Sequence, residues 1–119
     1  MLALVYDDKL KLDKNYPEPI VEDNEVLIKT TMAGICNTDY EITQGYMGYR
    51  GVLGHEFVGV VVKLGKNAPS DLLNKRVVGG INCACDDCSW CHKDLQRHCS
   101  NRQTLGIWKK DGCFSEYFT

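Results

Sequence analysis

Several features that would assign this 119-residue chain to a common class are missing from it. No apolar stretch approaches the roughly 18 to 20 residues that span a bilayer. The N-terminal segment MLALVYDDKLKL has acidic residues where an export signal needs an apolar core. No run of Lys or Arg could follow a phosphate backbone, and the net charge of −2 comes from acids and bases mixed along the chain. These absences predict a cytoplasmic protein with neither a nucleic-acid nor a membrane partner.

The seven cysteines do not have the pattern of a secreted disulfide framework. Their number is odd, no export signal accompanies them, and five of the seven lie between Cys83 and Cys99. Such crowding favours a metal site over bridges spread through the fold. Hydrophobic residues make up 44% of the chain and charged residues 25%, which is typical of one soluble globular domain. We therefore expect residues 1–119 to form a single domain.

Short segments of alternating apolar residues predict strands. The strongest signal lies at 55–65 and should be central to the core; one of its two apolar faces is formed by Val58, Val60, Val62 and Leu64. Further strands are expected at 2–7, 9–14, 25–35, 76–81 and 112–118. Thr38-x-x-Glu41 has the form of a helix capping box, and Gly45 stands where a helix would stop, so a short helix is expected at 38–44. Many short strands indicate a mainly β fold, a barrel or sandwich with an excursion for the Cys-rich segment 83–99.

This excursion, which we call the cysteine lobe (residues 83–99), carries the pattern C-x2-C-x2-C-x7-C in Cys85, Cys88, Cys91 and Cys99. Four thiolates at about 2.3 Å complete the tetrahedral shell of zinc and leave no open position, so the spacing predicts a structural zinc site. Other interpretations stay open. An iron–sulfur cluster would have a different last interval and a following Pro, and a redox C-x-x-C would have a strand before it and a long helix after it. Disulfide pairing is the remaining alternative.

The cysteine lobe contains few residues that could order it by burial. Trp90 and Leu95 are its only large apolar residues, so an interaction other than the hydrophobic effect must hold it together. Cys83 is expected to be a spectator or a weak alternative ligand. His92 and His98 are expected at the surface, because four sulfurs already fill the metal shell.

A second set of metal-binding residue types lies at the ends of predicted elements. Cys36 follows one strand, and His55 with Glu56 begins another, so their side chains could converge on one point. Together they provide donors that catalytic zinc prefers and leave a position for water or substrate. Taken singly, the cysteine is as well explained as a small buried hydrophobe and the His-Glu pair as surface residues.

The motifs occur in one order, which is GICNTD at 34–39, GHEFVG at 54–59, the four-cysteine pattern, and GCFSEYF at 112–118. In this order and spacing the chain resembles the N-terminal catalytic domain of the zinc-containing medium-chain dehydrogenases, which include alcohol, sorbitol, threonine and archaeal glucose dehydrogenases. The resemblance covers nearly the whole chain. It implies a GroES-like, partly open β-barrel with short helices and a zinc-binding cysteine lobe, in a homo-oligomeric parent enzyme that uses zinc and NAD or NADP.

The resemblance also implies roles for single residues. Cys36 and His55 are similar to the ligands of the catalytic zinc, and Glu56 to the acid that can enter its shell. Thr38 is similar to the hydroxyl that binds the substrate oxygen and receives its proton while a hydride passes to nicotinamide. Asp39 is similar to the carboxylate that orients the histidine ligand. Without the resemblance, Thr38 and Glu41 are explained by the capping box and Asp39 as a first-turn acid.

The chain departs from the family's pattern at three points. Glu41 stands where many members have His at the outer end of a proton relay, and a carboxylate at this position resembles the glucose-dehydrogenase branch. Val52 replaces the usual Pro ahead of the GHE motif. The chain ends at Thr119 without a G-x-G-x-x-G dinucleotide motif. The resemblance implies that a third zinc ligand and the NAD(P)-binding Rossmann domain lie beyond it, and that residues 1–119 alone are inactive.

The substrate class stays open between several alcohols. Tyr46, Met47 and Ile81 would suit an aliphatic or aromatic alcohol, whereas Asn37 and Glu41 would suit a polyol or sugar. Two other functions compete with the dehydrogenase. A free-standing zinc module that binds a protein partner would have a basic stripe or an aromatic ladder, and a thiol buffer would have exposed cysteine pairs and no use for GHEFVG.

Overall fold

The computed structural model describes all residues 1–119, which form three small sheets rather than a closed barrel. The first sheet has the order β2 (Lys9–Asp13), β1 (Ala3–Asp7), β4 (Gly51–Val52). The second has the order β10 (Tyr117–Phe118), β3 (Val26–Gly34), β5 (Glu56–Leu64), β6 (Arg76–Val77), and the third β7 (Asn82–Cys83), β8 (Gln103–Leu105), β9 (Lys109–Lys110). The helices are α1 (Asn37–Thr43) and the 3-10 turns η1 (Tyr46–Gly48), η2 (Ser70–Leu72), η3 (Cys91–Lys93) and η4 (Gln96–His98). The prediction of a mainly β, partly open fold is confirmed, and no helix has the length and apolar character of a membrane span.

β5 lies inside the second sheet, as the sequence predicts, and the face that carries Val61 is the one turned toward the core. Val61 is completely buried and opposes Ile28 of β3, whereas Val62 is 38% exposed. The main core forms on the Val61 side and consists of Ile28, Val61, Leu105, Cys113 and Phe118. Because both faces of this strand are apolar in sequence, periodicity could not decide which one faces the core.

β3 contains an irregularity that reverses the direction of its side chains. Thr30 pairs with Gly59 and Met32 with the next residue, Val58, so Thr31 is an extra residue on this strand. A bulge of this kind shifts the alternation by one position. Met32, which shares its parity with the buried Ile28, is therefore 69% exposed.

Two predicted strands are shorter than expected. The segment 76–81 pairs with β5 only at Arg76 and Val77. In the segment 112–118, only Tyr117 and Phe118 pair with β3, while residues 112–114 donate single backbone hydrogen bonds to the turn at 52–54. The segment 112–118 is therefore divided between β3 and the turn at 52–54, and neither pairing runs along its whole length.

A second, smaller core packs α1 onto the segment that precedes His55. Ile42 of α1 is fully buried against Tyr49 and Leu53. This packing fixes the start of α1, which carries Cys36 at its N-terminal boundary, relative to the segment 49–55.

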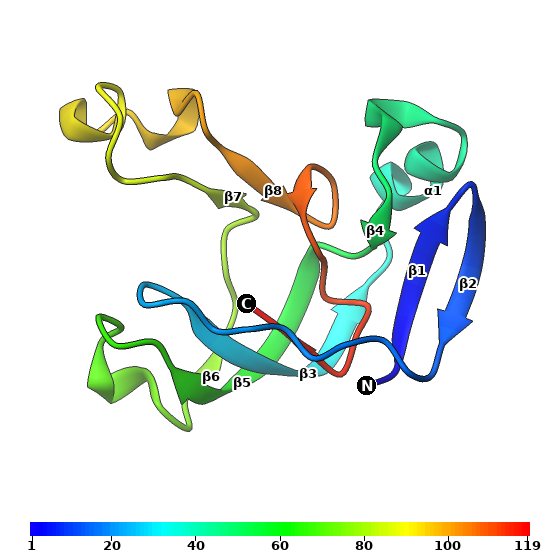
Figure 1. Cartoon of the computed structure of the whole chain (residues 1–119), viewed down its shortest axis with the longest axis horizontal. Coiled ribbons are helices and arrows are strands. Elements are labelled where there is room, and N and C mark those ends of the chain that lie inside the picture. The colour runs from blue at the N-terminus through cyan, green and yellow to red at the C-terminus, as the bar shows by residue number, and fades with distance from the viewer.

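The cysteine lobe stands away from the β3 and β5 sheet and is joined to the rest of the chain through β7 and β8 (Figure 1). The opposite end of the molecule holds the β1–β2 hairpin. There β1 meets a segment near the C-terminus, because Leu4 N donates to Phe114 O over 2.8 Å and Ala3 forms a bridge with Ser115.

Candidate metal sites

The four predicted sulfur ligands of the cysteine lobe converge on one point. The sulfurs of Cys85, Cys88, Cys91 and Cys99 all lie within 4.8 Å of one another. The closest pairs are Cys85 with Cys99 at 3.4 Å and Cys88 with Cys91 at 3.5 Å. At a metal–sulfur distance of about 2.3 Å, tetrahedral zinc holds its sulfurs roughly 3.8 Å apart. The lobe therefore has the dimensions of a four-thiolate zinc site.

The protonation equilibria of these thiols favour a shared cation. Backbone amides donate hydrogen bonds that lower the pKa of the Cys88 thiol to about 6, and the amide of Cys91 has the largest effect. Burial is the main cause that raises the pKa of the Cys91 thiol to about 12, and the neighbouring sulfurs of Cys88 and Cys99 add to it. Four thiolates cannot share this space without a positive charge to offset their repulsion. A divalent metal meets that requirement, and a thiol-ligating metal displaces the protons on binding.

The other donors of this region lie outside the cluster, as predicted. His92 and His98 are exposed, and the ring of His98 lies beside Trp90 with a centroid separation of 5.7 Å. Cys83 belongs to β7 and is not one of the converging donors. Burial raises the pKa of its thiol, so it is kept in the protonated form.

We expect the purified chain to retain close to one tightly bound zinc and to bind a second metal weakly. The lobe offers four closely spaced thiols, whereas the second donor set has three residues, of which Glu56 is exposed. Elemental analysis after dialysis against EDTA gives the stoichiometry. Iron-coloured protein, or four lobe thiols that react at once with a thiol reagent in the absence of denaturant, would contradict this prediction.

The second donor set is also brought together by the fold. Ligand atoms of Cys36, His55 and Glu56 lie within 4.8 Å of one another. Cys36 lies between β3 and α1, while His55 and Glu56 lie at the start of β5, and Gly34 pairs with Glu56 where the two strands meet. His55 is 6% exposed and Glu56 is exposed, so the set opens on one side. An open set of sulfur, nitrogen and oxygen donors has the character of a catalytic rather than a structural zinc site.

Asp39 joins the two segments that carry these donors. Its carboxylate accepts a hydrogen bond from Cys36 N at 2.9 Å through Oδ2 and from Gly54 N at 3.2 Å through Oδ1. The sequence prediction of a Thr38-x-x-Glu41 capping box is wrong, because Cys36 is the N-cap and Asp39 occupies the third helical position. An aspartate there can reach back to the N-cap amide, which is the contact that a glutamate makes in the standard capping box.

The same carboxylate faces the ring of His55. Its Nδ1 lies 3.4 Å from Asp39 Oδ1 but makes no hydrogen bond, although the ring is buried. A buried nitrogen without a partner costs free energy unless a small movement or a ligand satisfies the ring. If Nδ1 carries the proton and faces Asp39, then Nε2 is left with a free lone pair for a metal. These residues therefore fit a metal ion.

Thr38 and Glu41 lie at different distances from the donors. Thr38 Oγ1 is 3.6 Å from Cys36 Sγ, which places the hydroxyl beside the donor set. Glu41 is exposed and pairs loosely with Asn37 at 3.4 Å. No contact connects Glu41 to Cys36 or His55 in the structure.

Comparison with known proteins places the chain beside alcohol dehydrogenases. The alcohol dehydrogenase GroES-like domain family matches residues 22–119. L-threonine 3-dehydrogenase of Protochlamydia amoebophila is 37% identical over 112 residues, which cover 88% of this chain and 32% of that protein. L-galactonate-5-dehydrogenase of Escherichia coli is 41% identical over 105 residues, which cover 85% of this chain and 30% of that protein.

A solved structure agrees with these relatives in fold. The alcohol dehydrogenase TADH from Thermus sp. ATN1 superimposes with a TM-score of 0.86 at 25% identity, over 99% of this chain and 36% of that one. The chain thus spans about a third of the length of the relatives that it matches.

Proposed function

We propose, because this chain belongs to the GroES-like domain family of the zinc-containing medium-chain dehydrogenases, that residues 1–119 are the N-terminal catalytic part of a longer alcohol or polyol dehydrogenase. The complete enzyme would be a cytoplasmic homo-oligomer that oxidises a small alcohol, polyol or sugar with NAD or NADP. The observation that carries the proposal is the convergence of two separate donor sets, one closed and one open.

In this proposal the two donor sets have different tasks. Cys85, Cys88, Cys91 and Cys99 hold a structural zinc ion that orders the cysteine lobe. Cys36, His55 and Glu56 hold a catalytic one, which supplies Lewis-acid polarisation of the substrate oxygen.

The protein's own residues would then bind and orient the substrate. The Thr38 hydroxyl, 3.6 Å from Cys36 Sγ, is near enough to the donor set to accept the proton of an alcohol bound there. Asp39 would hold the His55 ring in the tautomer that leaves Nε2 free. Glu41 and Asn37 are exposed on the same helix as Thr38, and their polar groups favour a substrate with several hydroxyl groups. The names of the relatives that act on L-threonine and L-galactonate support a polar substrate.

The proposal is tested by assaying the complete native polypeptide against a panel of alcohols, polyols and sugar acids with both dinucleotides. We expect reduction of NAD or NADP with at least one substrate, and its loss after treatment with a zinc chelator. Absence of turnover with every member of the panel while both metal sites are filled would contradict the proposal.

A separate prediction concerns residues 1–119 alone. We expect this stretch neither to bind NAD or NADP nor to oxidise alcohols, because it contains no glycine turn for a pyrophosphate. Isothermal titration calorimetry with each dinucleotide measures this directly. Saturable micromolar binding would show that a nucleotide site lies within these residues.

A further inference from the structure

The turn that leads into His55 has every backbone polar group paired. The amide groups of Val52, Leu53 and Gly54 donate to Asp111 Oδ1 at 2.9 Å, Leu4 O at 3.3 Å and Asp39 Oδ1 at 3.2 Å. The three carbonyl oxygens accept from one segment, in the pairs Gly112 N to Val52 O at 2.8 Å, Phe114 N to Leu53 O at 2.9 Å, and Cys113 N to Gly54 O at 2.9 Å. A backbone held by this many hydrogen bonds has little freedom to shift.

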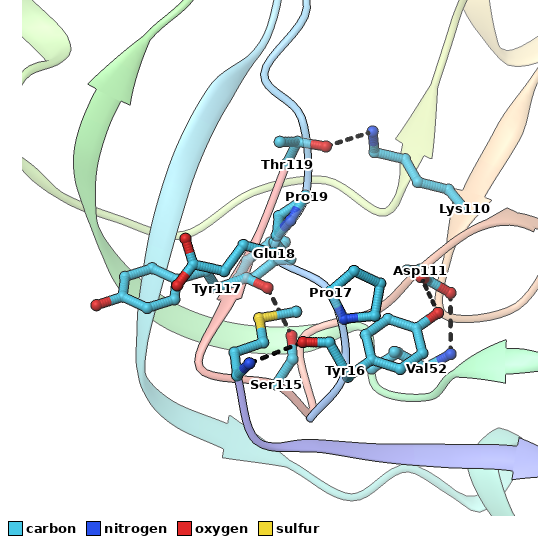
Figure 2. A pocket seen from close by; sticks show the side chains of 12 residues that line it. Tyr16, Pro17, Glu18, Pro19, Val52, Lys110, Asp111, Ser115, Tyr117 and Thr119 are labelled. Carbon is cyan, nitrogen blue, oxygen red and sulfur yellow. Dashed lines mark hydrogen bonds between the residues drawn. The ribbon is translucent and has the colours of Figure 1, made fainter. Parts of the chain in front are cut away.

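Asp111 links this turn to the N-terminal part of the chain. Figure 2 shows its carboxylate between the Tyr16 hydroxyl, which donates over 2.7 Å, and the Val52 amide. The Tyr49 hydroxyl also lies 2.9 Å from Val52 O and 3.3 Å from Asp111 Oδ1. The carboxylate thus anchors the beginning of the turn, and residues 112–114 hold its end.

Three glycines allow the two segments to approach each other more closely than side chains would permit. A Cβ atom on Gly106 or Gly112 would overlap Gly54 O, and one on Gly54 would overlap the ring of Phe114. All three glycines are buried. Gly54 has φ +94° and Gly106 has φ +62°, so both also need a left-handed backbone, whereas Gly112 has no such requirement. Gly112 is therefore needed only because this position has no room for a Cβ atom.

From this contact we infer that Gly112 is a positioning residue for His55, which acts by letting the segment 111–114 fix the backbone of the Val52–Gly54 turn. The inference rests on the proposed function in that His55 is taken as a metal ligand. A Cβ at position 112 pushes Leu53 O and Gly54 O away and so moves the next residue, His55. Because Cys36 is held by α1, this movement alters the spacing of the two donors.

The test compares Gly112→Ala with Gly80→Ala in the complete native polypeptide. Gly80 is a matched control, because a Cβ there meets no heavy atom within 4 Å and its φ is not left-handed. Each protein is freed of its second metal and titrated with Co²⁺, with affinity measured against a chelator and the d–d absorption bands recorded. Thermal unfolding and the zinc content of the cysteine lobe report on folding.

We expect Gly112→Ala to bind the second equivalent of Co²⁺ about 10- to 100-fold more weakly and with shifted absorption bands. The cysteine lobe should keep its zinc, and Gly80→Ala should match the wild type in every measurement. Wild-type affinity and bands in a folded Gly112→Ala protein would overturn the positioning role alone. A wild-type protein that binds no second metal would overturn the proposed function as well.

If Gly112→Ala does not fold, a second pair of variants tests whether the segment 111–114 positions His55. Asp111→Ala removes the acceptor for Val52 N without adding volume, while Asp111→Asn keeps an oxygen that can accept this hydrogen bond. We expect a several-fold loss of affinity in Asp111→Ala and its recovery in Asp111→Asn. Equal affinity in Asp111→Ala and the wild type would overturn the inference.

Discussion

In the complete enzyme, Cys36→Ala should lose turnover but keep its fold, whereas Cys88→Ala should lose the order of the cysteine lobe. Cys36 contributes a thiol to the open donor set, and loss of a metal that supplies several kcal/mol of catalysis predicts a fall in kcat/KM of about 10³-fold or more. The Asp39 half of the α1 cap survives, because this carboxylate accepts from the backbone amide of Cys36, which alanine keeps. The core clusters around Ile42 and Val61 do not include Cys36.

The cysteine lobe has no comparable support. Trp90 is 42% exposed and Leu95 is 37% exposed, so its only large apolar residues contribute little burial. Metal binding and folding of such a segment form one equilibrium, in which structural zinc contributes about 10–16 kcal/mol in small peptides. Loss of one thiolate should leave the metal weakly held and residues 83–99 open to proteases.

The comparison uses turnover per folded molecule, the thermal midpoint and limited proteolysis for both variants, with Cys83→Ala as a control thiol outside the donor set. Near-normal turnover in Cys36→Ala, or a protease-resistant lobe in Cys88→Ala, would show that the division into a catalytic and a structural zinc is wrong.

Asp39→Ala should damage stability and metal binding together. The side chain is 5% exposed and accepts hydrogen bonds from Cys36 N and Gly54 N. Each buried amide left without an acceptor costs about 1–3 kcal/mol. His55 would also lose the carboxylate that faces its Nδ1, so we expect metal affinity at the open site to fall about 10- to 100-fold. Denaturant unfolding and metal titration measure the two effects.

Asp39→Asn and Asp71→Ala separate the causes of this loss. Asparagine keeps one acceptor oxygen and should recover part of the stability but not the orientation of His55, because its amide can present a donor to Nδ1. Asp71 lies exposed in the first turn of η2, so its replacement should change neither property. Full metal affinity in a folded Asp39→Ala protein would exclude the orienting role of this carboxylate.

The sequence predicted those parts of the fold and site that depend on local spacing. The strands β1 and β2 follow from the alternation of apolar residues in 2–7 and 9–14, and the cysteine lobe follows from its two-residue intervals. The convergence of Cys36 with His55 could be expected because strand ends carry both residues. Each of these inferences needs only the period of an element or the reach of a short turn.

Features that depend on contacts between distant segments were not predictable. The bulge at Thr31 depends on how β3 meets β5, and the cap of α1 by Asp39 depends on a carboxylate that also serves Gly54. Position 112 lacks room for a side chain only because the folded chain brings it against Gly54. A glycine at the start of a predicted strand gave no sign of this role, since glycine is equally common in turns.

The meeting of the first strand with residues 114–116 affects how the protein is made. Leu2 N donates to Glu116 Oε2 across 114 residues of sequence, and Glu116 N donates to Leu2 O. At about 5–20 residues per second, a ribosome needs roughly 6 to 23 s to supply that length of chain. Until then the β1–β2 hairpin lacks this partner, and a lone hairpin is marginally stable in water. Ala3, which bridges Ser115 and is 1% exposed in the folded protein, therefore stays unburied until the chain is nearly complete.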